Sequence, residues 1–194
     1  RYKFYESVSK QSNATKVALG HHCGDQAETI LMNLLRGAGA AGLKGILPVR
    51  DGKFIRPLLN FSRGEIEEFV AELGLKPRED STNFDRDYLR NRIRLELLPL
   101  LKRDYNPNLQ NTLAQTAELL RAESDYLDDV VCEAFDTCQV KPASDAAIVL
   151  NRPLFLRHHL ALRRRILRLA LGKIQGEMTE ISFNHVESML KLTE

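Results

Sequence analysis

The sequence has few cysteines and no long apolar segment. Its three cysteines, Cys23, Cys132 and Cys138, stand at spacings typical neither of a metal site nor of a disulfide framework. Reduced thiols and a cytoplasmic location are therefore expected. No run approaches the roughly 18 uninterrupted apolar residues that a membrane span needs, so no membrane partner is expected. No secretion signal is expected either.

The chain also lacks an excess of charge of one sign. Its 28 lysines and arginines nearly balance 26 aspartates and glutamates, which leaves a net charge of +2. A polycation that binds nucleic acid over its whole surface is thereby excluded, and any contact with RNA must come from local basic patches. The apolar content of 43% is ordinary for a globular protein, and 194 residues suffice for one large domain or two small ones.

The most informative stretch is Gly20-His21-His22-Cys23-Gly24-Asp25-Gln26-Ala27-Glu28-Thr29. A short apolar run at 17–19 predicts a buried strand before it, and apolar periodicity up to residue 35 predicts a helix from about Asp25. In open α/β sheets, ligands bind where strands end and helices begin. At about 100° per residue, His21, Asp25 and Glu28 share one face, and the opposite face is apolar. The two acids either form part of a polar site or simply complement the helix dipole.

Other signals place the remaining elements. Ser62 with Glu65 three residues later predicts a capping box, and Pro99 predicts the end of a helix. A glycine-rich loop at 37–45 has no GxxxxGK[ST] phosphate-loop pattern. Pro57 argues against a central strand at 54–59. Further elements are expected at 1–13 (helix), 16–19 (strand), 62–73 (helix), 88–98 (helix), 108–137 (helix), 147–150 (extended), 153–173 (helix) and 183–192 (helix).

Two groups of arginines are candidate anion-binding residues. Arg90 and Arg94 share one face of the helix at 88–98, and Arg92 points elsewhere. They suit either a phosphate clamp or structural salt bridges with acidic residues nearby, namely Glu79, Asp80 and Asp85. The second group lies on one face of the helix at 153–173 and suits either a solvated face or contact with an RNA backbone; its members are Arg157, Arg164 and Arg168. No aromatic side chain is interleaved with this group for base stacking.

Several ordered motifs resemble those of the tRNA(Ile)-lysidine synthetases, in the PP-loop ATP pyrophosphatase superfamily. The motifs are Gly20–Thr29, Leu34–Gly39, Gly42–Gly45, Ile55–Leu59, Arg63, Glu79–Asn83 and Arg90–Arg94 with Leu97–Pro99. The resemblance implies an α/β remnant of a PP-loop (adenine nucleotide α-hydrolase-like) domain over residues 1–103. An all-α region over 104–194 is expected to follow, as a helical linker and tRNA substrate-binding domain. The chain is expected to be mostly helical overall.

The resemblance also implies a bacterial, ATP-dependent ligase. ATP, with Mg²⁺, adenylates the wobble cytidine of tRNA(Ile) with a CAU anticodon, and L-lysine then displaces AMP to leave lysidine. Asp25 and Glu28 could hold the cations of lysine, and one of them or His21 could accept a proton. Phosphate or the leaving AMP could be neutralised by five arginines, Arg36, Arg56, Arg90, Arg92 and Arg94. No tightly bound metal is expected.

The chain departs from this family at two points. The Ser-Gly-Gly-x-Asp-Ser phosphate loop belongs before Arg1, and no initiator methionine is present, so an N-terminally truncated fragment is expected. Without that loop, the 194 residues alone are expected neither to bind ATP normally nor to turn over. Gly24 stands where the family usually has an acid, but Asp25 keeps its place. Loss of strands from the sheet would expose edges and could lead to a homodimer.

Three other functions are compatible with some of these features. A tRNA thiolase of the same superfamily would need a suitably placed cysteine pair, which the three cysteines do not supply. A metal-dependent hydrolase could use His21, His22, Asp25 and Glu28 as ligands. A tRNA-docking fragment without catalysis would use the basic helix and would bind RNA in a salt-dependent manner.

Overall fold

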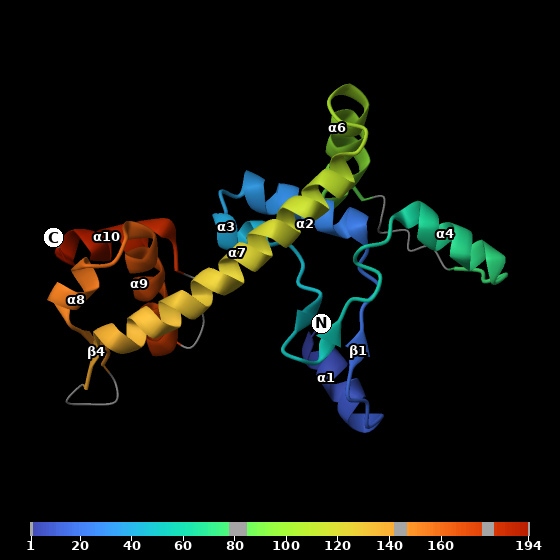
Figure 1. Ribbon diagram of the computed structural model, residues 1–194. Coiled ribbons are helices and arrows are strands. Elements are labelled where there is room, and N and C mark those ends of the chain that lie inside the picture. Colours follow the sequence, from blue (N-terminus) through green and yellow to red (C-terminus); the bar gives the residue numbers. More distant parts are fainter. Residues whose placement is uncertain (1, 78–84, 142–146, 176–180, 194) are drawn as a thin grey trace. The chain divides into compact units, whose positions relative to one another are not determined.

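The computed structural model describes residues 2–77, 85–141, 147–175 and 181–193, and they form two compact units (Figure 1). The first unit comprises residues 1–121 and the second residues 122–194, so the long helix α7 (Leu109–Cys138) begins in one and ends in the other. The domain boundary at 103/104 stays a prediction, because a domain boundary and a division into compact units need not coincide. Among the described residues, no helix is long and apolar enough to cross a membrane.

The first unit combines a small sheet with helices. Before α7, its elements are α1 (Tyr2–Gln11), β1 (Val17–Ala18), α2 (Cys23–Leu35), α3 (Ala40–Leu43), β2 (Val49–Arg50), β3 (Phe54–Ile55), α4 (Arg63–Glu72), α5 (Leu89–Arg92), the π-helical turn η2 (Ile93–Leu97) and α6 (Leu98–Asp104). The expected strand at 16–19 and the helices at 1–13, 62–73 and 108–137 are confirmed to within a few residues. The glycine-rich loop contains a short helix, α3, that was not expected.

The sheet of the first unit has the strand order β1-β3-β2. β1 pairs with β3 in parallel, and β2 pairs with β3 in antiparallel fashion across a turn at Asp51-Gly52. Both turn residues have positive φ, 53° and 59°, as a tight hairpin requires. The interpretation that Pro57 argues against a central strand is wrong, because β3 lies between β1 and β2 but ends at Ile55, before the proline.

The core of the first unit lies where α2 packs on α5 and η2. Ala27 and Leu31 of α2 are buried with Ile93 of η2 and Leu98 of α6. Helix formation continues past Pro99, contrary to the expectation, because a π turn precedes it and Pro99 occupies the first turn of α6. Pro99 stands at the start of α6, and the first turn is where helices tolerate proline. The result is a nearly continuous run of helix from residue 89 to residue 104.

In its described residues, the second unit is helical apart from one hairpin. After the end of α7 it contains β4 (Gln139–Val140), β5 (Val149–Leu150), α8 (Arg152–Leu156), α9 (Leu160–Gln175) and α10 (Phe183–Thr193), around a core that includes Phe135, Phe155 and Ile166. The single helix expected at 153–173 is in fact two. The chain breaks at 157–159, where His159 Nδ1 accepts a hydrogen bond from the Ala161 N–H and helps to start α9.

Candidate functional site

The site begins where the two parallel strands end. The Leu19 N–H donates to the Ile55 carbonyl, so the chain leaves β1 and β3 at the same edge of the sheet. His21 follows one strand and Arg56 follows the other. Open α/β sheets bind ligands at this edge. The sequence analysis predicted a polar site at the same point of the chain, where a strand ends and a helix begins.

Helix α2 starts with a reciprocal cap formed by His22 and Asp25. The His22 ring accepts the Gly24 N–H at Nδ1 (3.0 Å), and the His22 N–H donates to Asp25 Oδ2 (3.0 Å). Because Nδ1 is an acceptor, the ring proton is on Nε2, which lies 3.5 Å from Asp25 Oδ2. A Cβ on residue 24 would lie 2.7 Å from His22 Cε1, so glycine leaves room for this ring. His21, one of the three candidate proton acceptors, is half-buried and precedes the cap.

Asp25 and Glu28 form an ion network with Arg90 and Arg94. Arg90 Nε lies 2.7 Å from Glu28 Oε2, and its Nη2 lies 2.8 Å from Asp25 Oδ1. Arg94 Nε lies 2.6 Å from Glu28 Oε1, and its Nη2 lies 3.2 Å from Asp25 Oδ1. The acids are three residues apart on α2 and the arginines four apart on α5 and η2, so each pair presents one face to the other. The structure thus brings together four of the predicted site residues.

The carboxylates lie beneath the guanidinium groups. Glu28 is 2% exposed and Asp25 8%, whereas the side chains of Arg90 and Arg94 are 37% and 27% exposed. Both oxygens of Glu28 already accept hydrogen bonds from arginine. Hydrogen bonding to Glu28 raises the pKa of Arg94 above its ordinary value. The network therefore offers fixed, partly exposed guanidinium N–H groups to an anion.

The sequence left open whether Arg90 and Arg94 form a phosphate clamp or structural salt bridges, and these contacts answer part of that question. Arg90 and Arg94 do form salt bridges, and their partners among the described residues include Asp25 and Glu28. Glu79 and Asp80, in the motif Glu79–Asn83, lie outside the described residues. The side chain of the third acid, Asp85, accepts the Asp87 N–H.

The other predicted anion-binding arginines are separate from this network. Arg36 and Arg92 are exposed. Arg56 is only 6% exposed, and its guanidinium donates to the Tyr2 hydroxyl (2.9 Å) and the Leu47 carbonyl. Among the residues that the structure describes, no carboxylate lies within ion-pair distance of Arg56. An arginine buried without a carboxylate partner can attract an anion.

The arginines predicted to bind RNA are all in the second unit. Arg164 Nε pairs with Glu187 Oε1 at 2.7 Å, and this guanidinium holds the pKa of Glu187 below its usual range. Arg168 donates to the Ile181 carbonyl at 3.0 Å. Arg157 is exposed. Two of the three thus make contacts within their own unit, and an RNA-binding role for the group stays a prediction.

A cavity of about 280 Å³ adjoins the start of α2. Its wall includes the Cys23 thiol, whose pKa is raised by burial, and the Gln26 amide, which accepts the Ile46 N–H at 2.6 Å. Within the described ranges, no three histidine, cysteine, aspartate or glutamate side chains converge as a metal site. The hydrogen bond between His22 and Asp25 is a feature that sequence reasoning missed, although the spacing of N-cap and third helical residue could have indicated it.

Comparisons with known proteins show which family the chain belongs to. A profile of the PP-loop domain matches residues 1–101. The chain is 42% identical over 193 residues to the tRNA(Ile)-lysidine synthase of Geobacter sulfurreducens, covering 99% of the chain and 41% of that relative. It is 39% identical over 196 residues to the synthase of Solibacter usitatus, covering 99% and 43%. The chain spans about two fifths of the length of these curated relatives. It belongs to the PP-loop domain family.

Proposed function

We propose that this chain is part of a tRNA(Ile)-lysidine synthase, an ATP-dependent ligase that joins L-lysine to the wobble cytidine of tRNA(Ile) with a CAU anticodon. Similarity along almost the whole chain to relatives of that name supports this function, as does the PP-loop domain. In the proposed reaction, the C2 carbonyl oxygen of the cytidine attacks the α-phosphate of ATP, and diphosphate leaves as the bond between the α- and β-phosphates breaks. The lysine ε-amine then forms the new C–N bond, and AMP leaves with the pair of electrons from the broken C–O bond.

The observation that carries the chemistry is the ion network at the start of α2. Arg90 and Arg94 each have a partly exposed guanidinium held at two points. Donors fixed in this way can stabilise negative charge on the departing adenylate without reorganising during the reaction. The residues therefore fit the phosphate of the ATP-derived group. We assign no Mg²⁺ ligands, because the described residues contain no cluster of metal-ligating side chains.

The roles proposed for the two acids differ. The contacts of Glu28 favour positioning of Arg90 and Arg94, because both of its oxygens accept from those arginines. Asp25 is also paired, yet it is less buried and lies against the Nε2–H of His22. Its direct contact with the lysine ammonium, and proton transfer by it or by His21, remain proposals. A proton acceptor is needed because only the uncharged amine attacks.

The wider assignments are also proposals. A PP-loop catalytic domain over 1–103 and a tRNA-binding helical domain over 104–194 are consistent with the profile match at 1–101. A cytoplasmic location follows from the tRNA substrate. A homodimer would use the outer edges of β1 and β2, which have no strand partner among the described residues.

The direct test is lysidine formation by a full-length protein that contains this chain. Unmodified tRNA(Ile) with a CAU anticodon, ATP and labelled lysine should give lysidine, AMP and diphosphate in equal amounts. The 194-residue chain alone should give none. Failure of the full-length protein to label this tRNA, or equal labelling of a tRNA with another anticodon, would contradict the proposed function.

Two variants then separate positioning from direct lysine binding. If Glu28 positions the arginines, Glu28→Gln should lower kcat and leave the KM for lysine nearly unchanged. A large rise in that KM would instead show that Glu28 holds the lysine ammonium. Arg94→Ala should lower kcat by about 100-fold, as loss of a fixed electrostatic donor does. Arg86→Ala, which breaks an exposed ion pair with Glu96, serves as the control and should keep the wild-type rate.

A further inference from the structure

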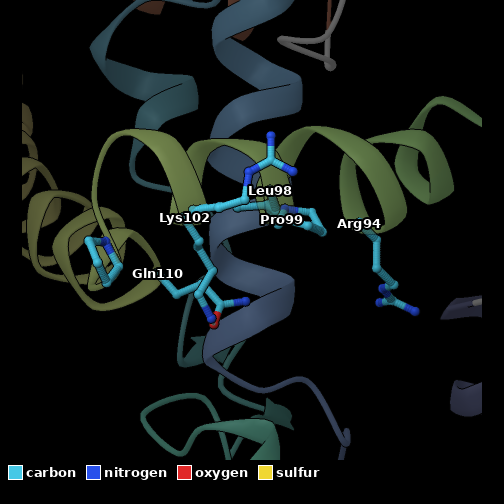
Figure 2. Close-up of a pocket in the computed structure, with 7 residues that line it drawn as sticks. Arg94, Leu98, Pro99, Lys102 and Gln110 are labelled. Carbon is cyan, nitrogen blue, oxygen red and sulfur yellow. The ribbon is translucent and has the colours of Figure 1, made fainter.

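A cavity of about 450 Å³ lies in the first unit between α6 and the start of α7 (Figure 2). Its lining residues are Arg94, Leu98, Pro99, Lys102, Arg103, Pro107 and Gln110. The cavity is shallow and opens widely to solvent. It shares Arg94 with the ion network at α2, so the two features adjoin.

The three cations at this cavity differ in their availability. Arg94 is bound to Glu28 and Asp25, and Arg103 is paired with Asp104, with Nη2 and Oδ2 2.8 Å apart. Lys102 Nζ has one hydrogen bond, to Gln110 Oε1 at 3.5 Å. In the described part of the chain, no carboxylate lies within ion-pair distance of Lys102. Lys102 is therefore the cation at this cavity that has no carboxylate partner within the described residues, and its ammonium is a strongly hydrated point charge.

The rest of the lining is apolar apart from one amide. Leu98, Pro99 and Pro107 contribute apolar surface, and the prolines have no N–H to donate. Figure 2 shows Leu98 and Pro99 beside Lys102 and Gln110, with Arg94 set apart from them. The Gln110 amide can both donate and accept hydrogen bonds. One cation, an apolar wall and an amide together match the phosphate, base face and base edge of one nucleotide.

We propose that this cavity binds one nucleotide of the RNA substrate, with the phosphodiester at Lys102, the base against Pro99 and Pro107, and its edge at Gln110. The proposal rests on the proposed function, which supplies the RNA. Lys102 lies eight residues beyond Arg94, about 12 Å along the helix axis. An RNA strand that reaches the ion network can therefore continue into the cavity. A phosphodiester carries one negative charge, which the ammonium of Lys102 can match.

The test measures binding of unmodified tRNA(Ile) with a CAU anticodon to the full-length protein at several salt concentrations. Lys102→Glu should weaken binding by about 10-fold. Lys102→Met, which keeps most of the apolar stem, should reduce the slope of log K against log[salt] by about 0.7–0.9, the loss of one phosphate contact. Gln110→Ala should weaken binding without changing the slope. Lys10→Glu makes the same charge change on α1, away from the cavity, and should bind within 2-fold of wild type.

The outcomes separate the two proposals. If wild-type protein forms lysidine but Lys102→Met binds the tRNA with unchanged affinity and slope, the cavity assignment alone is wrong. If the tRNA affinity holds but the KM for ATP rises in the Lys102 variants, the cavity binds a free nucleotide and the RNA assignment is again wrong. If wild-type protein binds the tRNA but forms no lysidine, the proposed function falls while the effect of Lys102 on RNA binding can still be confirmed.

Discussion

Replacing Glu28 by glutamine neutralises the most buried member of the ion network. A glutamine has one oxygen, so its NH₂ group would face guanidinium N–H donors of Arg90 or Arg94 that now have no acceptor. Breaking a fully buried ion pair costs about 3–5 kcal/mol. The side chains of Arg90 and Arg94 are 37% and 27% exposed, so water screens part of this loss. We expect a loss of about 2–3 kcal/mol in the free energy of unfolding.

The assay is thermal and urea unfolding followed by circular dichroism. For a chain of this size, 1 kcal/mol corresponds to about 2–4 °C, so the Tm should fall by about 4–12 °C. The matched control is Glu67→Gln, the same chemical change in a carboxylate that pairs with Arg63 at 2.6 Å where both side chains are over 60% exposed. The control should lose only about 0–1 kcal/mol. If the two variants lose equal stability, the network contributes no more than a surface pair, and the reasoning fails.

Two further predictions concern a tight turn and a helix cap. Gly45→Ala should lose about 1–3 kcal/mol by urea unfolding, because its φ is +64° and its Cβ would lie 2.6 Å from the buried Gln26. Gly52→Ala, with φ +59° and open space, should lose less. Hydrogen bonding from Ser62 lowers the pKa of Glu65. The contribution of the Glu65 carboxylate to the α4 cap should therefore persist below the ordinary pKa of a carboxyl group. It should disappear as the pH falls through the lowered pKa of Glu65. In a pH titration of the α4 backbone amides followed by NMR, the midpoint should lie at a higher pH in Ser62→Ala than in the wild type.

Features that depend on residues a few positions apart, such as helix caps and apolar helix faces, could be predicted from the sequence. Ser62 accepts the Glu65 N–H and the Glu65 carboxylate accepts the Ser62 N–H, so the capping box is confirmed. Asn151 likewise caps α8 by accepting the Leu154 N–H. Such contacts join residues three apart, and their spacing is visible in the sequence alone. The apolar stripe of α2 was also visible, and Ala27 and Leu31 are buried as that pattern requires.

The contacts that the sequence could not predict join distant segments. The arginine partners of Glu28 are more than 60 residues away, so charge pattern alone pointed to acids nearer in the chain. The break between α8 and α9 has no glycine or proline at 157–159 to mark it, and the cap by His159 is an unusual one. The apolar periodicity of α2 also failed at Leu34 and Leu35, which are exposed because they lie beyond the packed part of the helix.

The π turn η2 sets the direction in which Lys102 points around the helix axis relative to Arg90. Deleting one residue between Arg94 and Leu98 would leave a helix, but would turn everything after it by about 100°. Either the arginines would leave Glu28, or Leu98 and Lys102 would leave the core and the cavity. Substitutions in 95–97 can preserve both features, whereas a change in length cannot. The number of residues in this segment is therefore expected to be constrained even where their identity is free.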